Sequence, residues 1–180
     1  MALNHNDYGI ISEHQLTQIE VELEAYRLDL TVEQGGLGAA THFRNIADIL
    51  YGPDSPEPFV WHPWAEKMND CAHAHPMTGA LRPHIAFSGC ASSGKSMYGA
   101  LFGIINWLAD PQNTYVFITS TSLSEAKHRV WKSVVKMFTA VPELPGKLID
   151  SLGKIPTVRP DGNHDDTAGI FLIAAAPSKE

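Results

Sequence analysis

The sequence predicts an α/β fold in which a parallel sheet carries helices on its faces and an N-terminal helical arm precedes it. Three observations lead to this prediction. Apolar residues recur at helical spacing between residues 12 and 50, four prolines interrupt the chain between residues 53 and 63, and short apolar runs alternate with helical segments from residue 84 onward. Strands that alternate with helices are typical of parallel sheets. We therefore expect an arm and linker over residues 1–80 and an α/β domain over residues 81–180.

The arm begins with a helix signal. Ser12 and Gln15, three residues apart, form a capping-box pattern. The apolar residues that follow are spaced by three or four, which predicts one buried stripe on a helix of roughly 18 residues. These residues are Leu16, Ile19, Leu23, Tyr26 and Leu30. Gly35 and Gly36 should end this helix. A second helix is expected near residues 43–50, and a helical turn around residues 65–72 should follow the proline-rich linker.

The second half is predicted to alternate between strands and helices. Strands are expected at residues 84–88, 114–119 and 169–174, because these segments are short and apolar. Helices are expected at residues 94–109 and 122–139. Residues 141–167 contain four prolines and are expected to form a loop.

Residues 89–96 carry the most specific motif of the chain. They fit the pattern G-x-x-x-x-G-K-[ST] and read Gly89-Cys90-Ala91-Ser92-Ser93-Gly94-Lys95-Ser96. Small residues allow such a loop to wrap a phosphate, and its backbone N–H groups form an anion nest with the N-terminus of the next helix. Lys95 would place a charge at the β- and γ-phosphate oxygens, and the Ser96 hydroxyl would bind Mg²⁺. The motif therefore predicts ATP and Mg²⁺ as ligands, against the alternative of a glycine- and serine-rich turn that fits by chance.

The strand after this motif narrows the class of protein. It ends in Thr119 and Ser120 rather than in an acidic residue, and a helix with Ala126 near its start follows. The segment from Ser88 to Trp131, about a quarter of the chain, thereby resembles the ATPase domain of the large terminase subunit of tailed bacteriophages. The resemblance implies a sheet of the P-loop NTPase type, of the group with an additional strand between the P-loop strand and the acidic strand.

The resemblance also implies a function. Terminase motors hydrolyse ATP to push double-stranded DNA into a preformed capsid, and a separate nuclease domain cuts the DNA. Such a chain would work as a homo-oligomer in the host cell cytoplasm, with the portal and the small terminase subunit as partners. Aromatic residues upstream of the loop cover the adenine in that family, so Trp61 or Trp64 could stack on the base. The alternative is that both pack the arm.

The acidic strand that terminases use for hydrolysis has no clear match here. Residues 170–173 are apolar but lead into three alanines, and the short segment that ends in Asp150 lies between two glycines. The simplest interpretation is that the chain stops before the acidic motif, so we expect ATP binding with little or no turnover by these 180 residues.

Charge is unevenly distributed along the chain. The formal net charge is −7, yet residues 1–70 hold 12 acidic and only 3 basic residues. The helix predicted at residues 122–139 is basic: His128, Lys132 and Lys136 are spaced by four and Arg129 lies beside them. They could contact the DNA backbone without reading its sequence, or form a solvated helix face in which Glu125 pairs with Arg129.

Two weaker patterns suggest metals. Cys71, His73 and His75 could bind zinc, and His164-Asp165-Asp166 could belong to a metal site, but neither has the spacing of a known site. A loop and an exposed turn are the simpler interpretations. The two cysteines suit a reducing cytoplasm, and the chain has no apolar run long enough for a membrane span.

Three rival functions remain. The first is a helicase or an AAA+ ATPase, which shares the additional strand. The second is a small-molecule kinase, which would need an arginine-rich lid that the sequence lacks. The third is a non-catalytic interaction module with a vestigial loop, which binding of Mg-ATP would exclude.

Overall fold

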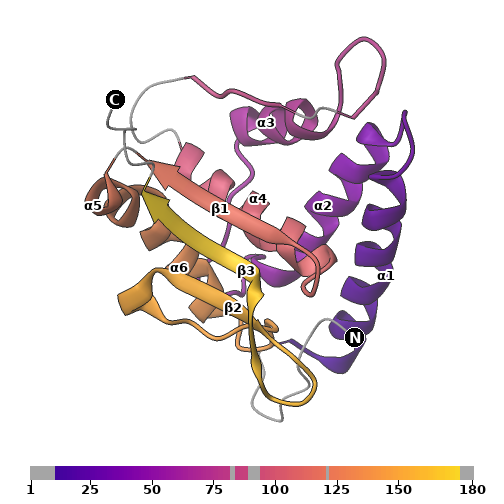
Figure 1. Cartoon of the computed structure of the whole chain (residues 1–180). Helices are drawn as coiled ribbons and strands as arrows, with labels where there is room; N and C mark the ends of the chain where they lie inside the picture. The colour runs from indigo at the N-terminus through magenta and orange to yellow at the C-terminus, as the bar shows by residue number, and fades with distance from the viewer. Residues whose placement is uncertain (1–10, 82–83, 89–93, 121, 175–180) are drawn as a thin grey trace. The chain divides into compact units, whose positions relative to one another are not determined.

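The computed structural model describes residues 11–81, 84–88, 94–120 and 122–174 (Figure 1). The chain divides into two compact units, one spanning Ile10–Lys95 and the other beginning at Ser96. The division therefore falls inside the motif at residues 89–96. In the described residues the fold is mixed α/β, with a small three-stranded sheet in the second unit.

The first helix of the arm confirms its sequence signal. Helix α1 spans Glu13–Asp29, and the Ser12 side chain accepts a hydrogen bond from the Gln15 backbone while the Gln15 side chain bonds back to Ser12. The predicted stripe is buried through Tyr26, whereas Leu30 is 37% exposed beyond the end of the helix. The capping box and the buried stripe together fix where α1 begins and which face it buries.

The second helix begins earlier than expected. Helix α2 spans Gly36–Leu50, so Gly36 starts α2 and does not end α1, which stops at Asp29. A side chain at position 36 would lie 2.6 Å from the His73 carbonyl oxygen, so close backbone approach requires glycine there. Gly36 thus marks a packing contact between the start of α2 and the end of the third helix, whereas sequence reasoning took Gly35 and Gly36 for a helix stop.

A buried polar network joins the three arm helices. Helix α3 spans Pro63–His73, and His73 is only 2% exposed. Its Nδ1 atom lies 2.9 Å from the Asn69 carbonyl oxygen and its Nε2 atom lies 3.0 Å from the Tyr26 hydroxyl. Because a carbonyl only accepts, Nδ1 carries the proton and Nε2 accepts from Tyr26. The Asn69 amide donates to the Ala40 carbonyl at 2.8 Å. These contacts hold α1, α2 and α3 together with a neutral imidazole.

The second unit packs helices around the sheet. Helix α4 spans Lys95–Ala109, and strand β1 spans Tyr115–Ser120. Helix α5 (Leu123–Ala126), the π-helical turn η1 (Lys127–Trp131) and helix α6 (Lys132–Ala140) form one continuous helical segment. A short 3₁₀ turn η2 (Asp150–Leu152), strand β2 (Lys154–Val158) and strand β3 (His164–Ala174) complete the described part.

The sheet is mixed, and the prediction of a parallel sheet holds for one pair of strands. The strand order is β1-β3-β2, with β1 parallel to β3 and β2 antiparallel to β3 (Figure 1). Phe117 of β1 aligns with Phe171 of β3. The helical segment α5–η1–α6 lies between β1 and β3 in sequence, as a parallel crossover requires.

Two predicted segments differ from the structure. Residues 84–88 form no strand, and residues 141–167 are not a continuous loop, because they contain η2, β2 and the first residues of β3. Strand β2 was not predicted, because it contains Pro156 and prolines indicate a loop. The strand accommodates this proline because it lies at the end of the strand order, and its register shifts between Pro156 and Thr157.

The two faces of the sheet differ in character. Val116 packs toward Gly103 of α4, where a Cβ atom would meet its Cγ1 at 3.2 Å. On the opposite face, Tyr115 is 48% exposed and Phe117 is 55% exposed, and both stand within 6.1 Å of Phe171, ring centre to ring centre. One face therefore belongs to the core and the other carries an exposed aromatic cluster. Within the described ranges, no helix combines the length and apolar character needed to cross a membrane.

The His73 network predicts a pH dependence of stability. Burial lowers the pKa of His73 below its ordinary value, against the opposing effects of the Asn69 carbonyl and Asp70. A histidine with a lowered folded-state pKa contributes stability that is complete above the unfolded pKa of about 6.5 and is lost as the pH falls toward the folded value. The free energy of unfolding should therefore decrease as the pH is lowered from about 6.5.

Chemical denaturation at several pH values checks this expectation. A His73→Gln variant should be less stable at pH 8 by about 1–3 kcal/mol, because it disturbs a buried hydrogen-bonded network. It should also lose less stability than the wild type between pH 7 and pH 5. Parallel pH profiles of the two proteins would show that His73 does not titrate as the geometry requires.

Candidate nucleotide-binding site

The motif at residues 89–96 is described only at its end. Gly89, Cys90, Ala91, Ser92 and Ser93 lie outside the described residues. Gly94 has a positive φ of 75°, and α4 begins at the next residue, Lys95. Lys95 and Ser96 are half-buried in the first turn of this helix. The structure thus shows a left-handed residue directly followed by a helix N-terminus.

This arrangement is suited to an anion. A helix N-terminus carries free N–H groups and a partial positive charge, and the first turn of α4 contains no acidic residue to neutralise it. Lys95 adds a formal positive charge at the same end of the helix. The motif lacks the expected strand before it, since residues 84–88 are irregular. Of the predicted strand–loop–helix context, only the helix is therefore found.

Gly94 is also contacted from the arm. A Cβ atom at this position would lie 2.2 Å from Cη2 and 2.9 Å from Cζ2 of Trp64, the second residue of α3. Glycine is therefore required twice, by the left-handed φ and by the indole that occupies the space of a side chain. Both residues belong to the unit Ile10–Lys95. The sequence pattern suggests Trp64 for stacking on the base and does not predict this contact, which joins residues 30 positions apart in the chain.

The two candidate tryptophans have different surroundings. Trp61 donates from Nε1 to the Asp48 carboxylate at 2.6 Å, and the Arg44 guanidinium lies 5.1 Å from its ring centre. Trp61 is therefore held on the arm by polar and cation–π contacts. Trp64 stacks on His62 at 5.8 Å and is 37% exposed, next to Gly94. Only Trp64 lies at the candidate site.

The acidic residues considered for a metal are engaged in other contacts. The Asp150 carboxylate accepts a hydrogen bond from Trp131 Nε1 at 2.8 Å, which ties η2 to the helical segment. Asp165 accepts from Arg159 at 2.6 Å and from Thr167. The Thr167 and Arg159 hydrogen bonds lower the pKa of Asp165 to about 2. Asp166 pairs with Lys154 at 2.8 Å.

These acids therefore serve the structure of the second unit. The His164-Asp165-Asp166 segment forms the start of β3 and is not an exposed turn. In the arm, both ring nitrogens of His73 are bonded within the protein, so this residue of the Cys71–His75 pattern is not available to zinc. Among the residues that the structure describes, no group of three or more His, Cys, Asp or Glu side chains is arranged to hold a metal ion.

A basic face runs along the segment α5–η1–α6. His128, Arg129, Lys132 and Lys136 are exposed on it, while Trp131 and Val134 are buried on the other side. The π-helical turn η1 contains Lys127–Trp131, and because it closes with one residue more than an α turn, residues spaced by four align more closely. Arg129 lies 3.8 Å from Glu125, as the solvated-face interpretation expects. The π turn itself had no signal in the sequence.

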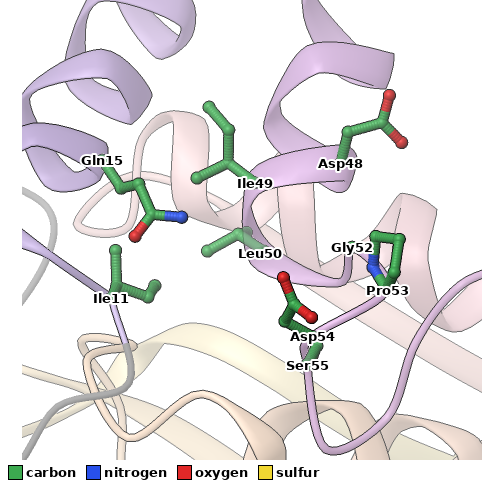
Figure 2. A pocket seen from close by; sticks show the side chains of 9 residues that line it. All are labelled: Ile11, Gln15, Asp48, Ile49, Leu50, Gly52, Pro53, Asp54 and Ser55. Atoms are coloured by element: carbon green, nitrogen blue, oxygen red, sulfur yellow. The ribbon is translucent and has the colours of Figure 1, made fainter.

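A small pocket lies elsewhere in the arm. It opens between the start of α1 and the turn that follows α2, and has a volume of about 120 Å³. Figure 2 shows that Asp48 and Asp54 line it together with Gln15 and Ile11. Asp48 is already bonded to Trp61. The pocket contains no residue of the motif at 89–96, and it was not predicted from the sequence.

Comparisons with known proteins do not add to this picture. No family model matches the chain, and neither a curated protein nor a solved structure matches it.

The structural role of Asp150 leads to a test. An Asp150→Ala variant should lose about 1–2 kcal/mol of unfolding free energy, because it leaves the buried end of Trp131 without its acceptor. Asp150→Asn keeps an acceptor oxygen and should stay within about 1 kcal/mol of the wild type. Denaturant titration measures both. If Asp150→Asn leaves stability unchanged but removes a magnesium requirement for nucleotide binding, Asp150 is a metal ligand instead.

Proposed function

We propose that residues 89–96 bind the phosphates of ATP together with Mg²⁺. The observation that carries this proposal is the left-handed Gly94 placed directly before the N-terminus of α4, with Lys95 and Ser96 in its first turn. A motif of type G-x-x-x-x-G-K-[ST] places a glycine before a helix N-terminus, where backbone N–H groups can cradle phosphates. Lys95 would neutralise the β- and γ-phosphates, and Ser96 would hold the magnesium ion.

We further propose that the chain belongs to a DNA-translocating ATPase of the terminase type. The parallel pairing of β1 and β3 across a helical crossover, and a strand β1 that ends in Ser120, support this proposal. The exposed basic side chains on α5–η1–α6 support contact with the phosphate backbone of DNA. The partners would be double-stranded DNA, other copies of the chain, the portal and the small terminase subunit. The same features fit a helicase or AAA+ ATPase, and the basic face favours both over a small-molecule kinase.

Hydrolysis needs a group that orients water, and the described strands do not supply one. Strands β1 and β3 end in Ser120 and Ala174, and the Asp150 carboxylate is bonded to Trp131. Phosphoryl transfer depends on positioning and charge stabilisation. We therefore propose that these 180 residues bind ATP with little turnover.

The binding proposal predicts the effect of a single substitution. Lys95→Ala should weaken Mg-ATP binding by about 10–100-fold, because it removes a charge-assisted hydrogen bond to the phosphates. Calorimetric titration measures the affinity. Lys147→Ala, which removes the same charge from an exposed loop position outside the motif, is the control and should bind like the wild type. Equal affinities for the Lys95→Ala variant and the wild type would rule out the proposed site.

The DNA proposal predicts a charge-reversal effect. A Lys132→Glu/Lys136→Glu variant should bind duplex DNA more weakly and should reduce the slope of log affinity against log salt by about 2, one unit per lost lysine contact. The control is Lys67→Glu/Lys147→Glu, which changes the net charge equally at two exposed positions outside this helix. Fluorescence anisotropy at several salt concentrations measures the slope. An equal loss in both variants would indicate a general charge effect and would exclude a defined DNA face.

A further inference from the structure

We infer that the outer edge of strand β1 pairs with β1 of a second copy of the chain. The two strands run antiparallel about a two-fold axis at Phe117, so that the two three-stranded sheets join into one continuous sheet. This surface lies entirely in the second unit, and it has no part in the proposed binding of ATP.

One edge of β1 has no neighbouring strand among the described residues. In the strand order β1-β3-β2, β1 pairs with β3 alone. The Gly169 N–H donates to the Thr114 carbonyl at 3.0 Å, and Tyr115 is the register partner of Gly169. Residue 114 therefore turns its backbone polar groups toward β3, and successive residues of β1 alternate between β3 and the outer edge. The outward residues are Tyr115, Phe117 and Thr119.

The edge at the other end of the sheet is protected. Strand β2 contains Lys154 and Pro156, and its register with β3 shifts after this proline. The loop before β2 also covers its outer side: the Lys147 N–H donates to the Pro156 carbonyl at 3.1 Å, and the Ile149 N–H donates to the Lys154 carbonyl at 2.8 Å. Charges, prolines, bulges and covering loops prevent a sheet edge from pairing with another chain. Strand β1 has no charged residue and no proline, and its register with β3 is regular over all six residues.

The outer edge of β1 is complementary to itself. Residues that face each other across an antiparallel pair lie on the same face of the sheet, and only residues that point toward the partner exchange hydrogen bonds. A two-fold axis at Phe117 meets both conditions for every outward residue, because Phe117 then faces its own copy and Tyr115 faces Thr119. An axis one residue further along would leave one of them opposite a residue outside β1. Each facing pair exchanges two N–H···O bonds.

The side chains on this edge also favour the pairing. Tyr115 is 48% exposed and Phe117 is 55% exposed, on the face of the sheet that carries the aromatic cluster. Pairing would bring the two Phe117 rings together, each next to Phe171 of its own copy, and would cover aromatic surface that is now open to water. Because β1 carries no charge, no like-charge repulsion between the strands opposes it.

Sedimentation velocity of the full 180-residue chain under reducing conditions tests the pairing. The wild type should show a monomer–dimer equilibrium that shifts to dimer as the concentration rises. Thr119→Pro removes an outward N–H and leaves the bonds to β3 intact, so it should weaken the dimer about tenfold or more, since each copy loses one N–H···O bond. Thr119→Val keeps the N–H and is the matched control, which should dimerise like the wild type.

A second variant tests the position of the axis. Phe117→Lys places two like charges opposite each other at the two-fold axis, at a side chain that is already exposed in the monomer. It should abolish the dimer at concentrations where the wild type dimerises. Leu152→Lys is the matched control, because it replaces a 65% exposed apolar side chain of the same unit outside the sheet. This control should dimerise like the wild type.

Amide hydrogen exchange followed by NMR identifies the edge directly. When the dimer is populated, exchange should slow at the outward amides of Tyr115, Phe117 and Thr119. Exchange at Val116 and Ile118 should change little, because these amides are already bonded to β3. An alternating response of this kind is specific to pairing through the edge of a strand.

Three results would overturn the inference. The first is a chain that remains monomeric at every concentration. The second is slow exchange of the outward amides in the monomer, which would show that another part of the same chain covers the edge. The third is a dimer that survives Thr119→Pro but not Phe117→Lys, which would show that the aromatic faces stack and the edges do not pair. No nucleotide is present in these experiments, so their outcome is independent of the proposed ATP binding.

Discussion

The left-handed turn at Gly94 is the constraint on which the account of this protein depends. It directly precedes the N-terminus of α4, where the charge of Lys95 adds to the partial positive charge of the helix end. It also brings the backbone against Trp64, where no side chain would fit. Helix α3, which carries Trp64, is fastened to the rest of its own unit by buried contacts such as the bond from Asn69 to the Ala40 carbonyl.

Charged side chains are arranged differently in the arm and on the segment α5–η1–α6. In the arm, several charged groups are paired internally: Glu22 lies 2.6 Å from His42, and Arg44 lies 3.0 Å from Glu66. On the segment α5–η1–α6, by contrast, Lys132 is exposed, whereas its neighbour Trp131 is buried. Among the described residues, α5–η1–α6 thus presents exposed basic side chains in a chain whose formal net charge is −7.

Local patterns predicted local structure. The capping box at Ser12 and the apolar stripe gave α1, and the apolar run after residue 114 gave β1. The predictions that were wrong depended on tertiary contacts. Gly36 is a glycine because the backbone of His73 approaches it closely, and it does not end a helix. Strand β2 accommodates Pro156 because it lies at the end of the sheet, where the missing N–H is tolerated. For the site, the sequence predicted the motif and the helix that follows it. It could not predict the contact of Trp64 with Gly94, because a contact between residues distant in the chain depends on the tertiary fold and not on a local sequence pattern.

The most direct test observes the backbone of the turn. In a ¹⁵N-labelled chain titrated with Mg-ATP, the amide resonances of Gly94 and Lys95 should shift strongly, because their N–H groups lie where the phosphates are expected to bind. The amide of Gly52, beside the small pocket in the arm, should not move. A titration in which Gly94 and Lys95 remain unchanged, while Gly52 shifts or no resonance responds, would contradict the account.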